Sequence, residues 1–137
     1  MTPHDLDIFT RTLYGEARGE YTHGGPAPLM AVANVIINRL NRGGKYGRTI
    51  TDICLKPRQF SCWNKNDPNR PLLFKEGLER DPLFYLCKTI AENISSGRWP
   101  DLTRDSDHYH ELSCRPSWAR TKKVRLRLGH HIFYKLD

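Results

Sequence analysis

The sequence predicts an α+β fold in which helices form the first two-thirds of the chain and a small antiparallel sheet follows near the C-terminus. Three segments before residue 97 carry apolar residues every three or four positions, which is the spacing of amphipathic helices. Beyond residue 107 apolar and polar residues alternate instead, as in strands. We expect one domain spanning 1–137, because single domains commonly hold about 100–150 residues.

The first predicted helix begins at Pro3. Thr2 is a preferred N-cap residue, proline suits the first helical position, and Asp5 can reach back to the cap. An apolar stripe then recurs at helical spacing, formed by Leu6, Phe9, Leu13 and Ala17. The stripe ends beside Glu16 and Glu20, which share one helix face because they are four positions apart. A loop over 21–28 is expected next, because its glycines and prolines disfavour a continuous helix.

The second predicted helix, 29–40, is dense in Ala, Val and Ile and is expected to be central and buried. Its polar residues Asn34, Asn38 and Arg39 would meet partners at the edge of the core, although Asn38 and Arg39 are equally compatible with a solvent-facing position. A short helical turn capped by Thr51 should follow.

The third long helix opens at Asp81-Pro82 and ends near Gly97. Strands are then expected over 107–112, 124–128 and 131–135, with Gly129-His130 as a turn between the last two. These strands should form one small sheet that packs on the helices.

Twenty-two Lys and Arg residues against 15 Asp and Glu give a net charge of +7, which draws the protein toward polyanions. Nucleic acid, anionic lipid and acidic bacterial envelope polymers all remain open, as does a basic surface that only aids solubility. Seven cations between 115 and 135 occur with no acid among them: Arg115, Arg120, Lys122, Lys123, Arg125, Arg127 and Lys135. These cations could bind the carboxylates of peptide stems or the phosphates of lipopolysaccharide, or they could form a solvent-exposed face that binds nothing.

The N-terminus has no basic start followed by an apolar run, so we expect synthesis in the cytoplasm without a signal peptide. No apolar stretch approaches the roughly 20 residues that a membrane-spanning helix needs.

The cysteines, Cys54, Cys62, Cys87 and Cys114, form no Cys-x-x-Cys pair, which argues against a zinc ribbon or a thioredoxin-like redox site. They are expected to be small buried side chains. A disulfide between Cys54 and Cys62 is the alternative if the protein leaves the cytosol.

The pair Glu16 and Glu20 indicates acid/base chemistry. A helix-borne glutamate beside apolar residues can have its pKa raised by desolvation and so keep a proton to donate. Glu16 fits this role, whereas Glu20 either assists or forms an ion pair with Arg18 or Arg39 that shapes the site.

Two further segments contain candidate binding residues. Gln59, Phe60 and Trp63 combine an amide with ring faces, as a sugar-binding cleft requires, although Phe60 and Trp63 suit core packing equally. His108 and His110 lack a third ligand at recognisable spacing, so we expect structural histidines, no metal and no cofactor.

The runs Leu13–Glu20, Ala31–Arg39 and Gln59–Trp63 together resemble the cell wall hydrolase family that includes the SleB spore cortex-lytic enzymes. The C-terminal runs His108–His110, Pro116–Ala119 and Gly129–Tyr134 are similar to that family's motifs too, so the resemblance spans essentially the whole chain.

The resemblance implies a peptidoglycan glycosidase of lysozyme-like fold with Glu16 as the catalytic glutamate, and with Tyr109 and His110 lining the sugar groove. It favours lytic transglycosylation of the MurNAc–GlcNAc bond over hydrolysis by water. The compact single-domain form looks like a phage endolysin, which would reach the wall after release through a holin, and we expect a monomer. A nucleic-acid-binding module and a non-catalytic wall-binding protein are the remaining alternatives.

Overall fold

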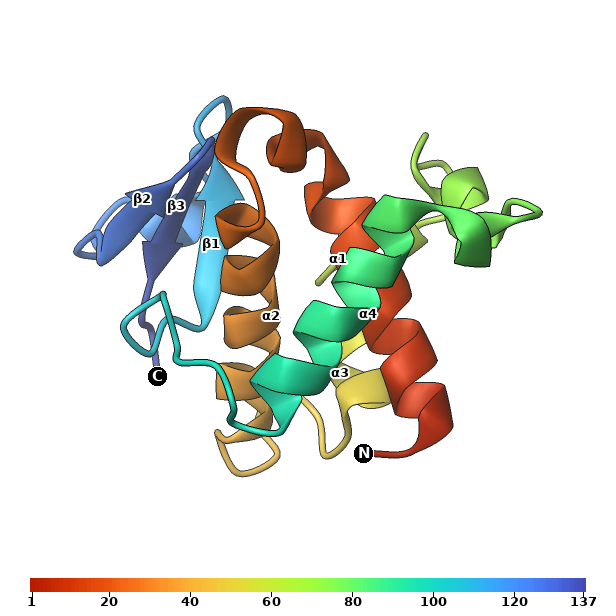
Figure 1. Cartoon of the computed structure of the whole chain (residues 1–137). Helices are drawn as coiled ribbons and strands as arrows, with labels where there is room; N and C mark the ends of the chain where they lie inside the picture. Colours follow the sequence, from red (N-terminus) through yellow and green to blue (C-terminus); the bar gives the residue numbers. More distant parts are fainter.

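The computed structural model describes all residues from Met1 to Asp137. The helices come first and the strands last, so the predicted α+β class is confirmed (Figure 1). The four α-helices are α1 (Pro3–Gly24), α2 (Ala27–Leu40), α3 (Ile50–Leu55) and α4 (Pro82–Ser95). The three strands are β1 (His108–Glu111), β2 (Leu126–Leu128) and β3 (His131–Tyr134). Short 3₁₀ turns lie between them: η1 (Ser61–Trp63), η2 (Arg70–Phe74), η3 (Leu78–Arg80) and η4 (Ser117–Ala119).

The start of α1 is the predicted capping box. The Thr2 hydroxyl accepts a hydrogen bond from the Asp5 backbone N–H, and the Asp5 carboxylate accepts one from the Thr2 backbone N–H, both at 3.0 Å. These contacts satisfy two N–H groups that the helix itself leaves unpaired.

The end of α1 differs from the prediction. The helix continues through 21–24, and only Gly25-Pro26 separates it from α2, so the expected loop over 21–28 is wrong. The N–H of Gly25 caps the last turn by donating to the Tyr21 carbonyl at 3.0 Å, and the positive φ of Gly25 reverses the chain there. Pro28 lies in the first turn of α2, where its missing N–H costs nothing.

Helix α2 lies between the sheet and the other helices (Figure 1). On one side it joins the main core, whose fully buried members include Phe9, Leu13, Leu29, Ile36 and Ile90. On the other side Ala31 and Val35 pack against Phe133 of β3. Burying each large apolar side chain contributes about 1.5–3 kcal/mol, so α2 holds the two layers together.

The polar residues of α2 are buried and bind the segment that leads into β1. Asn34 accepts from the Leu102 N–H at 3.0 Å, and the Asn38 amide donates to the Ser106 carbonyl at 2.9 Å. Arg39 donates to the Asp107 carbonyl at 2.7 Å and is 5% exposed. The solvent-facing alternative for Asn38 and Arg39 is therefore wrong, and these bonds fix where β1 begins.

The short helix α3 begins at Ile50 and is capped by Thr49, not by Thr51 as predicted. Thr51 instead donates to Asp5 through its hydroxyl and its backbone N–H, at 2.6 and 3.0 Å, because α3 packs beside the start of α1.

Helix α4 begins at Pro82 after the Asp81 cap, as predicted. Its C-cap is Ser96, and Gly97 follows with a positive φ.

The sheet is antiparallel, as the alternation of residues predicted. Its strand order is β1-β3-β2. Tyr109 of β1 and Leu126 of β2 both lie opposite Phe133 on the central strand. Val124 is exposed and lies outside β2. None of the helices is both long enough and apolar enough to span a membrane.

Candidate active site

The Glu16 carboxyl group is held by groups from two other parts of the chain. One oxygen, Oε1, accepts a hydrogen bond from the Tyr109 hydroxyl at 2.9 Å, and Oε2 accepts one from the Cys62 backbone N–H at 3.1 Å. Burial raises the pKa of Glu16 above its ordinary value, while these two hydrogen bonds partly oppose the rise. A carboxyl group in this position is fixed in direction and keeps its proton to higher pH than an exposed glutamate does, as suits a proton donor.

Gly15 allows η1 to approach α1 closely enough for the Cys62 contact. A Cβ at position 15 would lie 2.7 Å from the Cys62 Cβ and 2.8 Å from a methyl carbon of Leu73. No side chain other than hydrogen fits this space without displacing its neighbours. The glycine before Glu16 therefore serves packing, and helix α1 runs through it without a break.

Tyr109 is placed by the sheet. Its ring lies 4.8 Å from the ring of His131 and 5.6 Å from that of Phe133, measured between centroids. Burial, reinforced by the neighbouring Glu16, holds the pKa of Tyr109 well above its ordinary value. The phenol thus keeps its proton and remains a hydrogen-bond donor to Glu16.

Two adjoining cavities meet at Glu16. The larger, of about 540 Å³, is lined in part by aromatic rings, and its walls comprise Gly15, Glu16, Arg58, Ser61, Asn69, Tyr109, His110, Glu111, Cys114, Pro116, Trp118 and His131. The smaller, of about 230 Å³, has no hydrophobic lining residue and is formed by Gly15, Glu16, Arg18, Gly19, Glu20, Asn69, Glu111 and His131. We call the two cavities together the Glu16 cleft. It offers ring faces on one side of the acid and polar groups on the other, as a polyhydroxylated substrate requires.

Glu20 lines the smaller cavity but has different partners from those predicted. Its Oε2 lies 3.2 Å from Nδ1 of His130 and accepts from the His130 backbone N–H at 3.3 Å. Arg18 bonds Asn69 instead, and Arg39 is occupied by Gln59 and Asp107, so the predicted ion pairs of Glu20 with these arginines are wrong.

A glycine also permits the Glu20 contact with the β2–β3 turn. A Cβ on Gly129 would lie 2.7 Å from the Glu20 Oε2, and the φ of Gly129 is +58°. This turn therefore tolerates only a glycine without rearrangement.

The segment 59–63 faces the core more than the cleft. Gln59 accepts a hydrogen bond from Arg39 at 2.9 Å, and Phe60, which is 2% exposed, lies beneath the same guanidinium. The Trp63 indole donates to the Thr12 hydroxyl at 2.9 Å. None of the three lines the Glu16 cleft, because Arg39 and the core take up their polar groups and rings; the packing alternative applies to Phe60 and Trp63. Arg58 and Ser61 of this segment line the cleft instead.

Both histidines of β1 have protein partners. His110 lines the cleft, and its Nδ1 lies 2.7 Å from the Glu111 carbonyl, which can only accept, so Nδ1 carries the proton. Its Nε2 then accepts from the Tyr134 hydroxyl at 2.8 Å. His108 lies 2.8 Å from the buried carboxylate of Asp107. These contacts orient the two rings as parts of the sheet.

The structure adds cleft residues that were not predicted from the sequence. Glu111 lines both cavities from the end of β1, and Trp118 lines the larger one from η4. Trp118 lies within the Pro116–Ala119 motif, which was the only local signal for it. Apart from its place beside His110, nothing in the local sequence marks Glu111 as a cleft residue. It lines the cleft with Glu16 because of how the sheet and helices pack.

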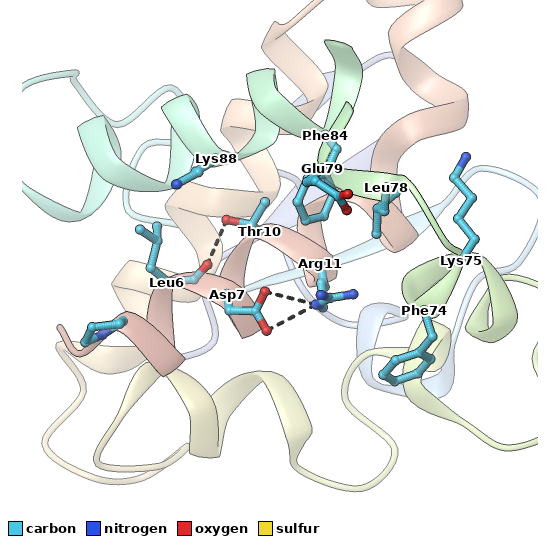
Figure 2. Close-up of a pocket in the computed structure, with 11 residues that line it drawn as sticks. Leu6, Asp7, Thr10, Arg11, Phe74, Lys75, Leu78, Glu79, Phe84 and Lys88 are labelled. Atoms are coloured by element: carbon cyan, nitrogen blue, oxygen red, sulfur yellow. Dashed lines mark hydrogen bonds and ion pairs between the residues drawn. The ribbon is translucent and has the colours of Figure 1, made fainter. Parts of the chain in front are cut away.

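A separate cavity of about 460 Å³ lies between α1, α4 and residues 74–79 (Figure 2). On α1 it is lined by Asp7, Thr10 and Arg11, which by helical spacing lie on the opposite face from Glu16. Arg11 donates from Nε to Asp7 at 3.0 Å (Figure 2). Its Nη1 donates to the Leu73 carbonyl. This cavity does not share a residue with the Glu16 cleft.

Comparison with solved structures shows the same fold in two catalytic domains. The catalytic domain of the Bacillus cereus SleB protein superimposes with a TM-score of 0.74 at 22% identity, covering 98% of this chain and 91% of that one. The catalytic domain of the germination-specific lytic transglycosylase SleB from Bacillus anthracis also gives 0.74, at 24% identity, covering 98% and 97%.

Sequence comparison gives a relative and a family. The spore cortex-lytic enzyme of Oceanobacillus iheyensis is 24% identical over 132 residues, which are 96% of this chain and 42% of that protein. The chain thus spans less than half the length of this relative. Residues 26–134, which comprise everything from α2 to the end of β3, match the cell wall hydrolase family. The chain therefore belongs to the cell wall hydrolase family.

Proposed function

We propose that this protein degrades peptidoglycan by cleaving the MurNAc–GlcNAc bond, with Glu16 as the acid and base. The observation that carries the proposal is the Glu16 carboxyl group, fixed by two hydrogen bonds at the junction of two cavities and raised in pKa by burial. Membership of the cell wall hydrolase family supports the substrate class.

The reaction begins with proton transfer from Glu16 to the glycosidic oxygen, and the bond between that oxygen and the anomeric carbon of MurNAc breaks. The Tyr109 hydroxyl and the Cys62 N–H stabilise the carboxylate that forms. Glu16 then takes the proton from the muramoyl 6-hydroxyl, whose oxygen bonds to the anomeric carbon. The product is a 1,6-anhydro-muramoyl end, no water is consumed, and Glu16 regains its proton.

The second candidate is hydrolysis of the same bond, which normally requires a second carboxylate across the substrate. Glu111 supports this route because it lines both cavities from the sheet, whereas Glu16 lines them from α1. Glu20 is less suited, since His130 already binds its carboxylate.

Two observations disfavour the functions from other classes. A nucleic-acid-binding sheet would present rings for base stacking, but Phe133 and Tyr134 are 0% and 1% exposed. A non-catalytic wall-binding protein predicts an exposed, replaceable glutamate at position 16, whereas this carboxyl group is bound on both oxygens.

The decisive experiment is digestion of purified peptidoglycan followed by mass spectrometry of the soluble products. The Glu16→Gln variant should release no muropeptides while still binding the wall, and release by this variant would remove Glu16 from the mechanism. Anhydro-muramoyl ends from the wild-type protein indicate transglycosylation, whereas reducing ends indicate hydrolysis. If reducing ends appear, Glu111→Gln should abolish them.

A further inference from the structure

The positive charge of the protein is concentrated at one end of the chain. Residues 1–114 carry 15 basic and 14 acidic side chains, whereas residues 115–137 carry 7 basic and 1 acidic. The formal charge of +7 is therefore +1 in the first segment and +6 in the second. Charge concentrated in this segment attracts anionic partners, and at physiological ionic strength the attraction acts over the Debye length of about 8–10 Å.

Six of these cations have no carboxylate partner: Arg115, Arg120, Lys122, Lys123, Arg125 and Arg127. We call them the basic rim. All six are exposed. Arg115, Arg125 and Arg127 donate only to backbone carbonyls, and Arg120, Lys122 and Lys123 make no side-chain hydrogen bond or ion pair. Lys135, the seventh cation of the run, is excluded because it pairs with Asp105 at 3.0 Å.

The connection from β1 to β2, in which the basic rim begins, borders the Glu16 cleft. Its residues Cys114, Pro116 and Trp118 line the larger cavity, and Arg115 and Arg120 lie within two residues of them in sequence. Trp118 anchors this connection to the sheet, since its ring lies 5.0 Å from His108 and 5.3 Å from Tyr134. A polymer that leaves the larger cavity on this side passes the start of the basic rim.

The chemistry of the proposed substrate identifies the anionic partner. A glycan strand of peptidoglycan carries peptide stems at regular intervals, and these stems bear free carboxylates. Arginine and lysine are the natural partners of such groups, and a flexible anionic stem suits exposed side chains. Arg58, which lines the larger cavity from the segment before η1, is a further exposed cation without a carboxylate partner.

We propose that the basic rim binds the stem-peptide carboxylates of the glycan strand that occupies the Glu16 cleft, and so makes the protein prefer stem-bearing over stem-free glycan. This inference rests on the proposed function, because it takes peptidoglycan as the occupant of the cleft. The rim acts on binding and leaves the chemistry to Glu16.

The test is a binding isotherm in a Glu16→Gln background, in which no cleavage disturbs the measurement. One portion of the peptidoglycan keeps its attached phosphate polymers and the rest is freed of them. Half of the freed material is then stripped of stems with an amidase, and DNA serves as a further ligand. The rim variant combines Arg120→Gln, Lys122→Gln and Lys123→Gln. The matched control combines Arg48→Gln, Lys88→Gln and Arg98→Gln, three exposed cations that line neither cavity of the cleft and make no ion pair.

The rim variant should bind stem-bearing peptidoglycan about fivefold more weakly at low ionic strength, with little change on stem-free glycan. The matched control should bind both as the parent does. A charge-preserving variant with Arg120→Lys, Lys122→Arg and Lys123→Arg should restore binding, which separates lost charge from misfolding.

Three outcomes would overturn the proposal. Equal weakening by the matched control would mean that only net charge matters. Equal weakening on stem-free glycan would exclude the stems as the partner. A loss seen only on walls that retain phosphate polymers, or only with DNA, would assign the rim to that polymer instead. Failure of the proposed function is distinguishable, because it appears as absence of muropeptides from wild-type digests, whatever the isotherms show.

Discussion

The hydroxyl of Tyr109 donates a hydrogen bond of 2.9 Å to Oε1 of Glu16 and joins the first strand to the first helix. This contact sets both the direction and the proton affinity of the carboxyl group. A hydrogen bond to the charged form stabilises it, so the bond lowers the pKa of Glu16 against the larger effect of burial.

Tyr109→Phe should therefore raise the pKa of Glu16 further. The proposed first step needs protonated Glu16, so activity should fall as the pH rises through this pKa. The alkaline limb of the pH–rate profile should therefore move to higher pH in the variant. The rate at the optimum should fall about tenfold to a hundredfold, since the carboxylate loses a charge-assisted hydrogen bond. Tyr85→Phe, at a tyrosine that is 69% exposed on α4, is the control. An unmoved alkaline limb in Tyr109→Phe would contradict the assigned contact.

Replacement of Gly15 and of Gly19 by alanine, on either side of Glu16 in α1, should change the stability of the protein in opposite directions. Gly15→Ala places a methyl group against Cys62 and Leu73, and should destabilise the protein by about 1–3 kcal/mol while displacing the Cys62 N–H from Glu16. Gly19→Ala meets nothing within 4 Å and lies within α1, so it should stabilise the protein by about 0.5–1 kcal/mol. Urea unfolding curves of both variants measure these differences. Similar stabilities for the two would refute the close approach of η1 to α1.

Labelling of the cysteine thiols should test whether Cys114 lies in the wall of the Glu16 cleft. Cys114 is exposed and lines the larger cavity, whereas the other three cysteines are buried and unbridged. Burial raises the pKa values of Cys54 and Cys87 to about 12, so these thiols resist modification. A bulky maleimide should modify Cys114 alone and reduce wall lysis, and Cys114→Ser should stay active after the same treatment. Full activity of the labelled wild-type protein would place Cys114 outside the substrate path.

Acid should weaken the junction of α1 and α3. The Thr51 hydroxyl and the Thr2 backbone N–H hold the pKa of the Asp5 carboxyl group well below its ordinary value. A lowered folded-state pKa means that the stabilisation is present above the unfolded pKa of about 4 and is lost as the pH falls below it.

Asp5→Ala should cost about 1–2 kcal/mol at pH 7 and progressively less toward low pH. Asp7→Ala removes an exposed pair with Arg11 and should cost less than about 0.5 kcal/mol. Thermal unfolding between neutral and acidic pH compares the two variants. A cost of Asp5→Ala that does not change with pH would argue against an ionised Asp5.

Local signals in the sequence predicted the starts of α1 and α4. The contacts of Thr2 with Asp5 and of Asp81 with Leu83 each join residues two or three positions apart, so a short stretch of sequence contains both partners. The end of α1 was mispredicted because glycine and proline weaken a helix without excluding it, and α1 continues through 21–24 as far as the Gly25 cap.

The cleft could be predicted only in part. The resemblance pointed to Glu16, and the structure places this residue with Tyr109 and His110. The segment 59–63 has a composition that fits a sugar site and a core equally, and the buried guanidinium of Arg39 selects the core by binding Gln59 and covering Phe60. Arg39 lies 20 residues before Gln59 in sequence, so no local pattern reveals the pairing.

The long reach of the Glu16 contacts has a consequence for biosynthesis. The partners of its two oxygens follow 46 and 93 residues later, and the second becomes available only with β1. A nascent chain that has released all four α-helices from the ribosome still lacks Tyr109 and the walls supplied by the sheet. Loop closure over such separations is slow relative to helix formation, so the helical layer forms early and the acid is oriented last. We therefore expect the Glu16 carboxyl group to remain unoriented during most of synthesis, until β1 has formed and the sheet has packed on α2.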